Sequence, residues 1–394
     1  MKSLLAFVTG LAFAAASPAF ARGDAEKKGE TGGLAPAVAG GGRPEFSWDT
    51  VPLYIHVGKN GGFTDEEIEF VAARSNFVCL EKGHGASLHG GTEKGIEHDA
   101  ARLKAANSKM KVIYYWNTFL DYPMYEAHRV YERHPEWWLR TLDGSLDKKR
   151  GTLKRYDLSN AEIRQWWAEE VRKAVVDGSC DGVFMDAFPQ IAAAANIKLW
   201  GKEKYDAILD GLVATVALTR KKVGADGILV FNGIRNTNSL HFGMQYLDVA
   251  DGAIIEHFDQ FQSRDKENVA GDIEDMIAAG KRGKIVIMKG WPGFTWLDEE
   301  IRGARYDELL ARARESITFP LACFLVAARP HSYFCYSWGY REQHGSLSDY
   351  RELSRPLGEP AGDATRNGWI YTRSFEHVDV WLDVSEKTAK LNWK

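Results

Sequence analysis

The sequence is poor in cysteine, and its cysteines form no metal-binding or redox motif. It has 4 Cys in 394 residues and no Cys-x-x-Cys pair, which excludes a disulfide scaffold and a zinc module. His84, His89 and His98 match no metal-binding spacing, so we expect neither a metal nor another cofactor. No G-x-G-x-x-G and no P-loop follows the first apolar run, which removes the usual sequence reasons for nucleotide binding.

The sequence also lacks an excess of charge of one sign and long apolar segments. The 50 Lys and Arg are balanced by 54 Asp and Glu. This balance leaves no basic footprint, and we expect no nucleic-acid partner. After residue 21 no stretch of about 18 uncharged residues occurs, so we expect no membrane span.

The N-terminal segment has the composition of an export signal. Lys2 precedes an apolar stretch from Leu4 to Ala16, and Ala19-Phe20-Ala21 is a small-x-small cleavage site. We therefore predict a signal peptide at residues 1–21 and a periplasmic or secreted product. Residues 22–45 contain seven Gly and two Pro, a composition that predicts a flexible linker.

The remaining chain has the pattern of an α/β protein. Apolar residues make up 45% of the sequence and aromatic residues 12%, enough for a large core. Short β-rich runs alternate with helical patterns, which is typical of a parallel sheet with helical crossovers. Eight such runs over about 290 residues favour a (β/α)8 barrel at residues 46–345 over an open doubly wound sheet. At residues 346–394, alternation from Val378 to Val384 predicts a C-terminal β-hairpin packed on the barrel.

The predicted elements have the following bounds. The eight strands are Val51–Val57, Phe77–Leu80, Lys111–Trp116, Gly182–Met185, Gly227–Phe231, Gly252–Ile255, Lys284–Met288 and Ser332–Tyr336. The helices between them are Asp65–Arg74, His98–Asn107, Ala161–Val176, Lys204–Val223, Glu267–Ala279 and a long one at Arg305–Val326. The connector at residues 234–250 is expected to contain only a short helical stretch.

Two acidic residues stand at predicted strand ends. Active sites of such barrels lie at the carboxyl ends of the strands. Asp186 follows the fourth predicted strand and Glu256 the sixth, so the two side chains face one another across the barrel mouth. Hydrolysis of a glycosidic bond requires two carboxyl groups on either side of the scissile bond. The alternative is that each carboxylate caps a helix or pairs with a basic residue.

Other strand-end side chains are suited to binding a sugar. Tryptophan rings stack on the apolar C–H faces of sugars, and the sequence contains 13 Trp. Trp166 and Trp167 lie in a predicted helix and are expected to pack there. Glu81 and Asp157 would be the replacement acids if the first pair fails. The residues expected to bind substrate are Glu81, Lys82, Trp116, Asn117, Asp157, Asn232, Lys289, Trp291 and Trp338.

Several short segments resemble one family. They are Pro135-Glu136-Trp137-Trp138-Leu139, Asp143-Gly144, Tyr156-Asp157-Leu158-Ser159-Asn160 with Arg164, and Asp181-Gly182-Val183-Phe184-Met185-Asp186. From Val51 to Tyr340 the chain resembles the bacterial barrels called hypothetical glycoside hydrolase family fifteen. In related α-glycosidase barrels an Asp ending strand four is the nucleophile and an acid ending strand six is the acid/base. The resemblance implies these roles for Asp186 and Glu256. The amylase group places its acid on strand five, where this chain has Asn232.

We therefore expect an exported glycosidase that acts on an α-linked oligo- or polysaccharide. Its mechanism requires Glu256 to stay protonated near neutral pH, while hydrogen bonds or a cation such as Lys289 keep Asp186 charged. Two alternatives stay open. The protein is a carbohydrate-binding barrel without catalysis, or it is a lyase or aldolase that forms a Schiff base on Lys289.

Overall fold

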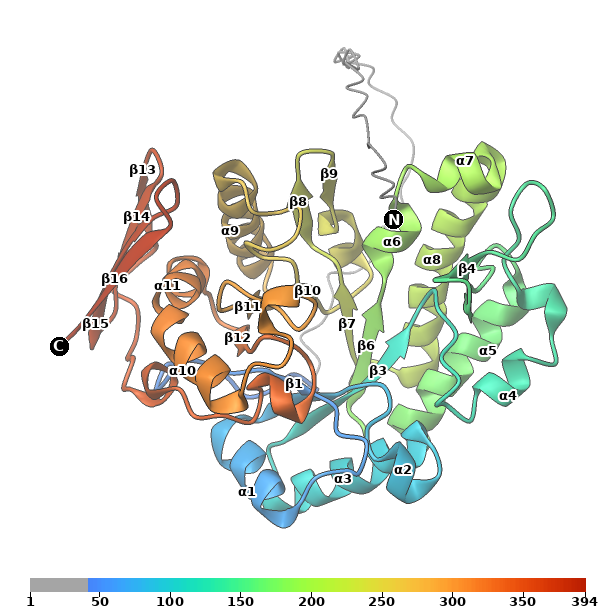
Figure 1. Cartoon of the computed structure of the whole chain (residues 1–394), viewed down its shortest axis with the longest axis horizontal. Coiled ribbons are helices and arrows are strands. Elements are labelled where there is room, and N and C mark those ends of the chain that lie inside the picture. Colours follow the sequence, from blue (N-terminus) through green and yellow to red (C-terminus); the bar gives the residue numbers. More distant parts are fainter. Residues whose placement is uncertain (1–41) are drawn as a thin grey trace, which may run out of the picture. The chain divides into compact units, whose positions relative to one another are not determined.

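The computed structural model describes residues 42–394, and the predicted signal peptide lies outside the described residues. Eight parallel strands form one sheet in the order β1-β2-β3-β6-β7-β10-β11-β12 (Figure 1), and this confirms the predicted (β/α)8 barrel. Within residues 42–394 no helix is both long and apolar enough to cross a membrane. The strand bounds are Ile55–Val57 (β1), Phe77–Leu80 (β2), Lys111–Asn117 (β3), Gly182–Asp186 (β6), Ile228–Asn232 (β7), Gly252–Ile255 (β10), Ile285–Gly290 (β11) and Ser332–Tyr336 (β12).

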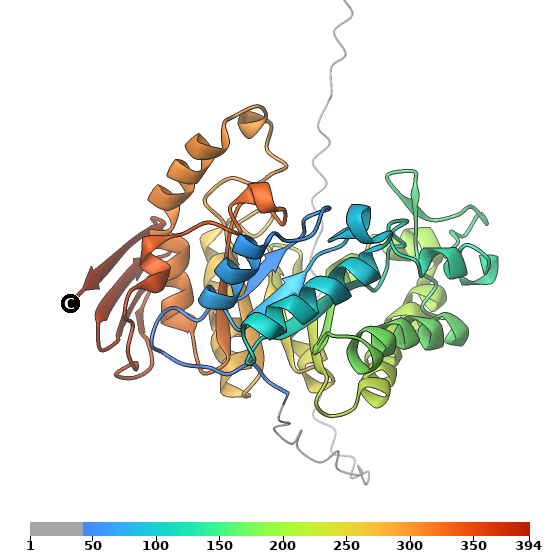
Figure 2. The ribbon, with the colours of Figure 1, turned by 90° about the horizontal axis from the view of Figure 1, so that it is seen from below.

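Helices cover the outside of the strands, as Figure 2 shows from below. The strands are almost wholly buried, which explains why the sequence shows them as continuous apolar runs. The first helix begins with a capping box in which Thr64 and Glu67 satisfy each other's backbone N–H groups. The main helices are Asp65–Arg74 (α1), Thr92–Ala106 (α3), Ala161–Arg172 (α5), Lys202–Val223 (α8), Lys266–Lys281 (α9), Tyr306–Ser316 (α10) and Thr318–Ala327 (α11).

The prediction of one long helix at residues 305–326 is wrong, because the structure divides it into α10 and α11 at Ile317. Pro320 explains the break. Proline has no backbone N–H, and its ring clashes with the carbonyl four residues earlier, here that of Ser316. The break therefore falls where α10 ends.

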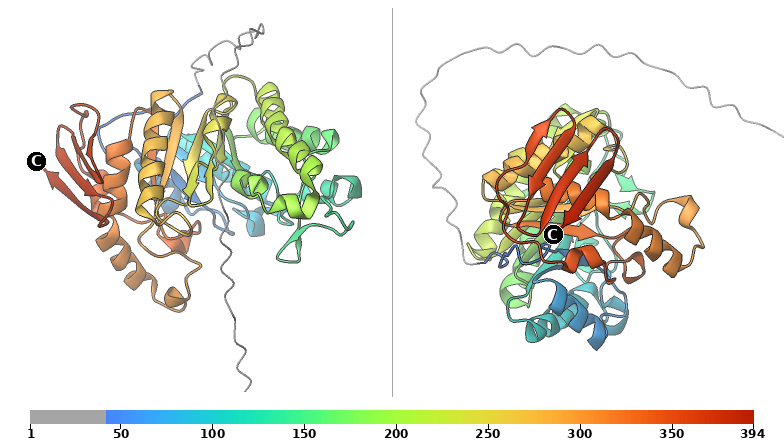
Figure 3. Two further views of the ribbon diagram at one scale, coloured as in Figure 1. Left: turned by 90° about the horizontal axis from the view of Figure 1, so that it is seen from above. Right: turned by 90° about the vertical axis from the view of Figure 1, so that its left-hand side faces the viewer.

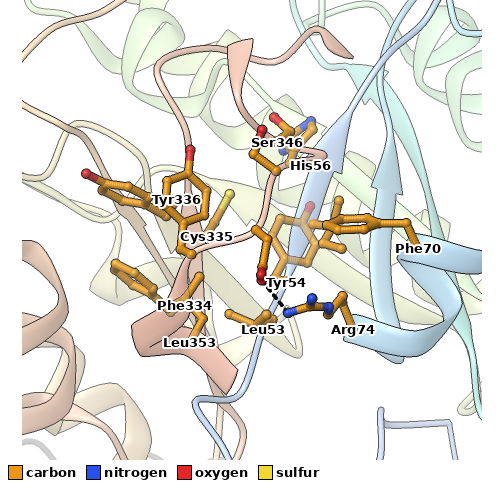
Figure 4. Close-up of a pocket in the computed structure, with 14 residues that line it drawn as sticks. Leu53, Tyr54, His56, Phe70, Arg74, Phe334, Cys335, Tyr336, Ser346 and Leu353 are labelled. Atoms are coloured by element: carbon orange, nitrogen blue, oxygen red, sulfur yellow. Dashed lines mark ion pairs between the residues drawn. The ribbon is translucent and has the colours of Figure 1, made fainter. Parts of the chain in front are cut away.

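The barrel closes between its first and last strands by fewer contacts than elsewhere. Single bridges join Leu53 to Phe334 and Gly58 to Arg341. A cavity of about 40 Å³ lies beside this closure (Figure 4). The ion pair between Arg74 and Asp349, with 2.6 Å between Nη1 and Oδ1, stands at its edge.

Two small hairpins project from the carboxyl ends of the barrel strands. One is formed by β4 (Lys148–Lys149) and β5 (Leu153–Lys154). The other is formed by β8 (Arg235–Thr237) and β9 (Leu240–Phe242). The second hairpin lies in the connector that was expected to be only partly helical, and a short 3-10 helix at Met244–Asp248 follows it. Short helices complete these loops at Ala86–His89 (α2), His128–Tyr131 (α4), Phe188–Ala192 (α6) and Asn196–Trp200 (α7).

The C-terminal extension is a four-stranded antiparallel sheet, so the prediction of a simple hairpin is wrong. Its strands are β13 (Thr365–Asn367), β14 (Ile370–Ser374), β15 (Val378–Asp383) and β16 (Thr388–Trp393). One face packs on α11, as Figure 3 shows. Arg373 extends from that face and donates hydrogen bonds to the carbonyls of Leu325 (2.8 Å) and Ala328 (2.5 Å) at the end of α11. A cation at a helix C-terminus satisfies carbonyls that the helix leaves free.

Close strand packing predicts a large effect of a small substitution in β10. A Cβ added at Gly252 would lie 2.2 Å from the carbonyl oxygen of Ile285, whereas one added at Gly61 meets nothing within 4 Å. We expect Gly252→Ala to lower the free energy of unfolding by about 1 to 3 kcal/mol, the usual cost of overpacking. Gly61→Ala is the control and should change it by less than about 1 kcal/mol. Urea unfolding followed by tryptophan fluorescence measures both, and equal effects would contradict the packing argument.

Candidate active site

Asp186 is the last residue of β6, and its carboxylate is held by four hydrogen bonds. Oδ2 accepts from the Tyr115 hydroxyl (2.5 Å) and from Nδ2 of Asn117 (2.9 Å). Oδ1 accepts from Nδ2 of Asn232 (2.8 Å) and from the backbone N–H of Ala187 (2.7 Å). Ala187 has a φ of 82°, a left-handed conformation that costs energy for a residue with a Cβ and recurs at functional sites. The chain therefore holds Asp186 in one fixed orientation.

Glu256 follows β10 and has its own set of donors. Oε2 accepts from Nδ2 of Asn232 (2.5 Å), and Oε1 accepts from the Tyr340 hydroxyl (2.7 Å). Nε2 of His257 lies 3.4 Å from Oε2, and the side chain of Glu256 is 20% exposed. The indole N–H of Trp291 donates to the backbone carbonyl of Glu256 (2.8 Å). Glu256 is thus both anchored and open to solvent.

The amide of Asn232 joins the two acids. Its single nitrogen Nδ2 contacts Oδ1 of Asp186 at 2.8 Å and Oε2 of Glu256 at 2.5 Å. An amide nitrogen carries two hydrogens, one for each carboxylate. The two oxygens are therefore separated by at most the sum of these distances, about 5.3 Å, which is shorter than the separation that inverting glycosidases need.

Because the two carboxylates are close, each affects the pKa of the other. Burial and the charge of Glu256 raise the pKa of Asp186. Burial also acts to raise the pKa of Glu256, but the hydrogen bonds and charge of its neighbours, His257 first, outweigh it and lower that pKa. This is the reverse of the expected order, in which Glu256 keeps the proton. Such a pair titrates as one unit.

Glu81 and Lys82 form a second charged pair beside the first. Nζ of Lys82 lies 2.6 Å from Oε2 of Glu81 and 4.4 Å from the centre of the Tyr115 ring. Burial acts to raise the pKa of Glu81, but Lys82 and His56 outweigh it and lower that pKa to about 2. The charge of Lys82 also lowers the pKa of Asp186. Lys82 is therefore a cation that supports the charged form of Asp186.

Lys289, the cation expected near Asp186, has a different role in the structure. Its side chain is fully buried, and Nζ donates to the carbonyl (2.5 Å) and hydroxyl (2.8 Å) oxygens of Ser337. It lies 4.2 Å from the centre of the Trp291 ring. Burial lowers the pKa of Lys289 to about 8. A carbonyl substrate would have to displace these contacts to form a Schiff base, which disfavours the lyase alternative.

The structure brings most of the predicted residues to the barrel mouth and places three elsewhere. Trp116 alternates with Tyr115 and Asn117 on β3, so it points outward and packs against Trp166 and Trp167 of α5. Trp338 is 1% exposed and packs against other aromatic rings. Asp157 pairs with Lys204. The predicted residues found around the pair are Glu81, Lys82, Asn117, Asn232, Lys289 and Trp291.

Sequence reasoning missed four residues of the mouth, namely Tyr115, His257, Tyr340 and Trp296. Tyr115 could have been found, because side chains two apart on a strand share a face and Asn117 was already assigned inward. Tyr340 and Trp296 lie in loops without a periodic pattern. The Trp296 ring is 37% exposed and stacks on Trp291, with 5.7 Å between centroids.

A (β/α)8 barrel with two carboxylates at the carboxyl ends of its strands has the architecture of a glycoside hydrolase. Residues 104–379, more than half of the chain, match the family described as hypothetical glycosyl hydrolase family 15. The chain belongs to this family, and the protein is a glycoside hydrolase. The matched segment includes Asp186, Asn232 and Glu256.

Solved structures that are similar to this chain include two alpha-amylases and an alpha-galactosidase. An alpha-amylase from Lactobacillus plantarum is 10% identical over 86% of this chain and 89% of its own, with a TM-score of 0.50. A maltogenic alpha-amylase from Thermotoga neapolitana is 12% identical over 85% of each chain, with a TM-score of 0.48. An alpha-galactosidase from Thermus thermophilus is 17% identical over 86% of this chain and 67% of its own, with a TM-score of 0.45. At 10% identity the likeness to the Lactobacillus plantarum enzyme concerns the fold alone. No curated protein sequence matches the chain.

The low pKa of Glu81 predicts a pH dependence of stability. Its value falls from an ordinary 4.5 to about 2 on folding, so the charged form stabilises the fold above pH 4.5. That contribution is lost as the pH falls from 4.5 towards 2. We expect the stability difference between the wild type and Glu81→Gln to shrink from pH 6 to pH 3 in urea unfolding. Glu69→Gln, an exposed change on α1, is the control, and a difference for Glu81→Gln that does not vary with pH would contradict the prediction.

Proposed function

We propose that this glycoside hydrolase is exported and cleaves an α-linked oligo- or polysaccharide with Asp186 and Glu256 as its catalytic pair. The observation that supports the pair most directly is the contact of both carboxylates with one nitrogen of Asn232. An amide that binds both acids fixes their separation, and the separation decides whether both can act on one glycosidic bond. The α linkage and the export rest on the family resemblance and the signal-like N-terminus.

The geometry favours retention of anomeric configuration. Retaining enzymes separate their carboxyl groups by about 5 to 5.5 Å, whereas inverting enzymes need about 6.5 to 9.5 Å to fit a water. The upper limit that Asn232 sets for the two oxygens it contacts, about 5.3 Å, is below the inverting range. A bound sugar would then be attacked by one of the two carboxylates.

The contacts favour Asp186 as the nucleophile. Four donors hold it at the end of a strand, and a nucleophile gains from such fixed orientation. Glu256 protonates the leaving oxygen while Asp186 attacks the anomeric carbon and the glycosidic bond breaks. Glu256 then removes a proton from water, which attacks the same carbon and releases Asp186.

This assignment requires the bound sugar to change the proton affinity of Glu256. Glu256 is the more acidic partner in this structure, whereas the first step requires its protonated form. A sugar that covers its exposed side would remove water from the carboxylate and raise its pKa. Once Asp186 carries the sugar, its negative charge no longer raises the pKa of Glu256, so Glu256 is ionised and can accept a proton from water.

Aromatic rings extend from the Glu256 side of the mouth. Trp296 stacks on Trp291, and Tyr340 contacts both rings edge-on, with 5.5 Å to Trp296 and 6.0 Å to Trp291 between centroids. Trp291 and Tyr340 each hydrogen-bond Glu256. The exposed ring of Trp296 is therefore placed to stack on the sugar that leaves with the proton of Glu256.

Removal of each acid predicts a distinct kinetic result. On activated aryl α-glycosides, Asp186→Ala should lower kcat/KM at least about a hundredfold. Glu256→Ala should instead lower kcat by a similar factor, because the activated leaving group needs no proton in the first step while the second step still needs a base. Azide should rescue both variants. In Asp186→Ala it takes the place of the nucleophile and gives a glycosyl azide of inverted configuration. In Glu256→Ala it takes the place of the water that Glu256 activates and gives one of retained configuration. Proton NMR distinguishes the two glycosyl azides. Asp157→Asn is the control and should keep activity within about threefold. The opposite pattern of products would exchange the roles of Asp186 and Glu256, and full activity of both alanine variants would contradict the pair.

The opposite placements of two tryptophans predict opposite effects. Trp296→Ala should raise KM for an oligosaccharide about tenfold, since one aromatic stacking contact is lost, with little change in thermal stability. Trp116→Phe should lower the melting temperature and leave kcat/KM within about twofold, because Trp116 packs outside the barrel. Initial rates and thermal unfolding of both variants check this. A loss of activity confined to Trp116→Phe would contradict the placement.

A further inference from the structure

Two hairpins approach the mouth from either side of α6, the short helix that follows Asp186. Figure 1 shows the β8–β9 hairpin on one side of α6 and β4 on the other. Nζ of Lys149 on β4 donates to Oε1 of Gln190 on α6 (2.8 Å). On the other side, a Cβ added at Gly233, two residues before β8, would lie 2.5 Å from Cδ of Pro189 on α6. Lys149 therefore contacts α6 directly, and Arg235 begins the hairpin whose preceding residue Gly233 packs on α6.

Arg235 has no protein partner for its charge. Within residues 42–394 its guanidinium donates no side-chain hydrogen bond and forms no ion pair, and its Nε is buried without an acceptor. The side chain as a whole is partly buried. A buried donor without an acceptor is costly and rare in native proteins. Burial lowers the pKa of Arg235, and the nearby charges of Glu256 and Asp272 oppose that shift. An unsatisfied guanidinium thus lies within electrostatic reach of Glu256.

Lys149 is a second cation of this kind. It is partly buried, and in the described part of the chain its amine binds the neutral amide of Gln190 and no carboxylate. Burial lowers its pKa and so do the charges of Arg155 and Arg150, whereas the charges of Asp186 and Glu256 act to raise it. Lys82 pairs with Glu81, and the fully buried Lys289 donates to oxygens of Ser337. Lys149 and Arg235, by contrast, are only partly buried and pair with no carboxylate in the described residues.

We propose that the sugar bound at this mouth carries an anionic group, a carboxylate or a sulfate ester, which Arg235 and Lys149 bind. The proposal rests on the proposed function, since it names the substrate class of the same site. Guanidinium groups bind planar and tetrahedral oxyanions through two parallel hydrogen bonds, and an ammonium adds a point charge. Such an anion supplies acceptors for the terminal guanidinium nitrogens of Arg235, which bind no acceptor within the described residues. A neutral hydroxyl accepts a hydrogen bond but leaves both charges unneutralised.

The test compares binding of charged and neutral glycans by isothermal titration calorimetry. The probes are an α-1,4-linked oligogalacturonate, maltohexaose as its neutral counterpart, and sulfated maltohexaose, each titrated into the full chain. We expect the oligogalacturonate or the sulfated glycan to bind at least tenfold more tightly than maltohexaose, and the tighter of the two identifies the anion. Arg235→Gln and Lys149→Gln should each weaken that binding about tenfold or more, because a charge-assisted hydrogen bond is lost. Arg235→Lys keeps the charge and loses the two parallel hydrogen bonds. Its affinity for that glycan should therefore lie between those of the wild type and Arg235→Gln.

Lys148→Gln is the matched control. Lys148 is the exposed neighbour of Lys149 on β4, and its replacement removes the same charge from the other face of the hairpin. It should leave binding within about twofold. An equal loss for Lys148→Gln, tighter binding of maltohexaose, or no binding of either anionic glycan would each overturn the proposal. Equal weakening of charged and neutral glycans by Arg235→Gln would also overturn it, since the two cations would then act on the carboxylates alone.

Reducing-sugar release from the same three glycans separates this proposal from the proposed function. Release from maltohexaose alone, with tight binding of it, would support the hydrolase and contradict the anionic substrate. Tight, Arg235-dependent binding of an anionic glycan without any release would support the anion site and contradict hydrolysis by the pair.

Discussion

The site depends on one constraint, the contact of a single amide nitrogen with two carboxylates. Asn232 ends β7, between Asp186 at the end of β6 and Glu256 after β10, and these three strands are adjacent in the sheet. The parallel register brings all three side chains to the same edge of the barrel. Without the amide, two partly buried carboxylates this close would repel each other, and one would stay protonated or move away. The amide lets both acids stay close together.

The charged residues around Asp186 and Glu256 differ in whether a protein partner satisfies their charge, and the proposed substrate class follows from this difference. Glu81 and Lys82 neutralise each other beside Tyr115, and Lys289 is satisfied by Ser337. Lys149 and Arg235 have no anionic partner in the described residues. A site that binds only neutral sugars has no evident use for two cations without anionic partners.

Much of the fold could be predicted, because each barrel strand is a short apolar run that burial on both faces explains. All eight predicted runs are strands of the sheet, and Asp186 and Glu256 were found from their position after such runs. The failures have physical reasons. Pro320 divides a helix whose apolar pattern is continuous, and Trp116 points outward because side chains on a strand alternate. Trp296 and Tyr340 lie in loops, where no periodicity indicates which side chains converge.

The central claim is that Asp186 forms the covalent intermediate with Glu256 beside it. The direct measurement is mass spectrometry of the protein after treatment with 5-fluoro-α-glycosyl fluorides of neutral and uronic-acid sugars, which slow the second step. The account predicts one added glycosyl group, on the peptide that contains Asp186, and no added mass on Asp186→Asn. A label on the Glu256 peptide, or steady turnover without any labelled peptide, would contradict it.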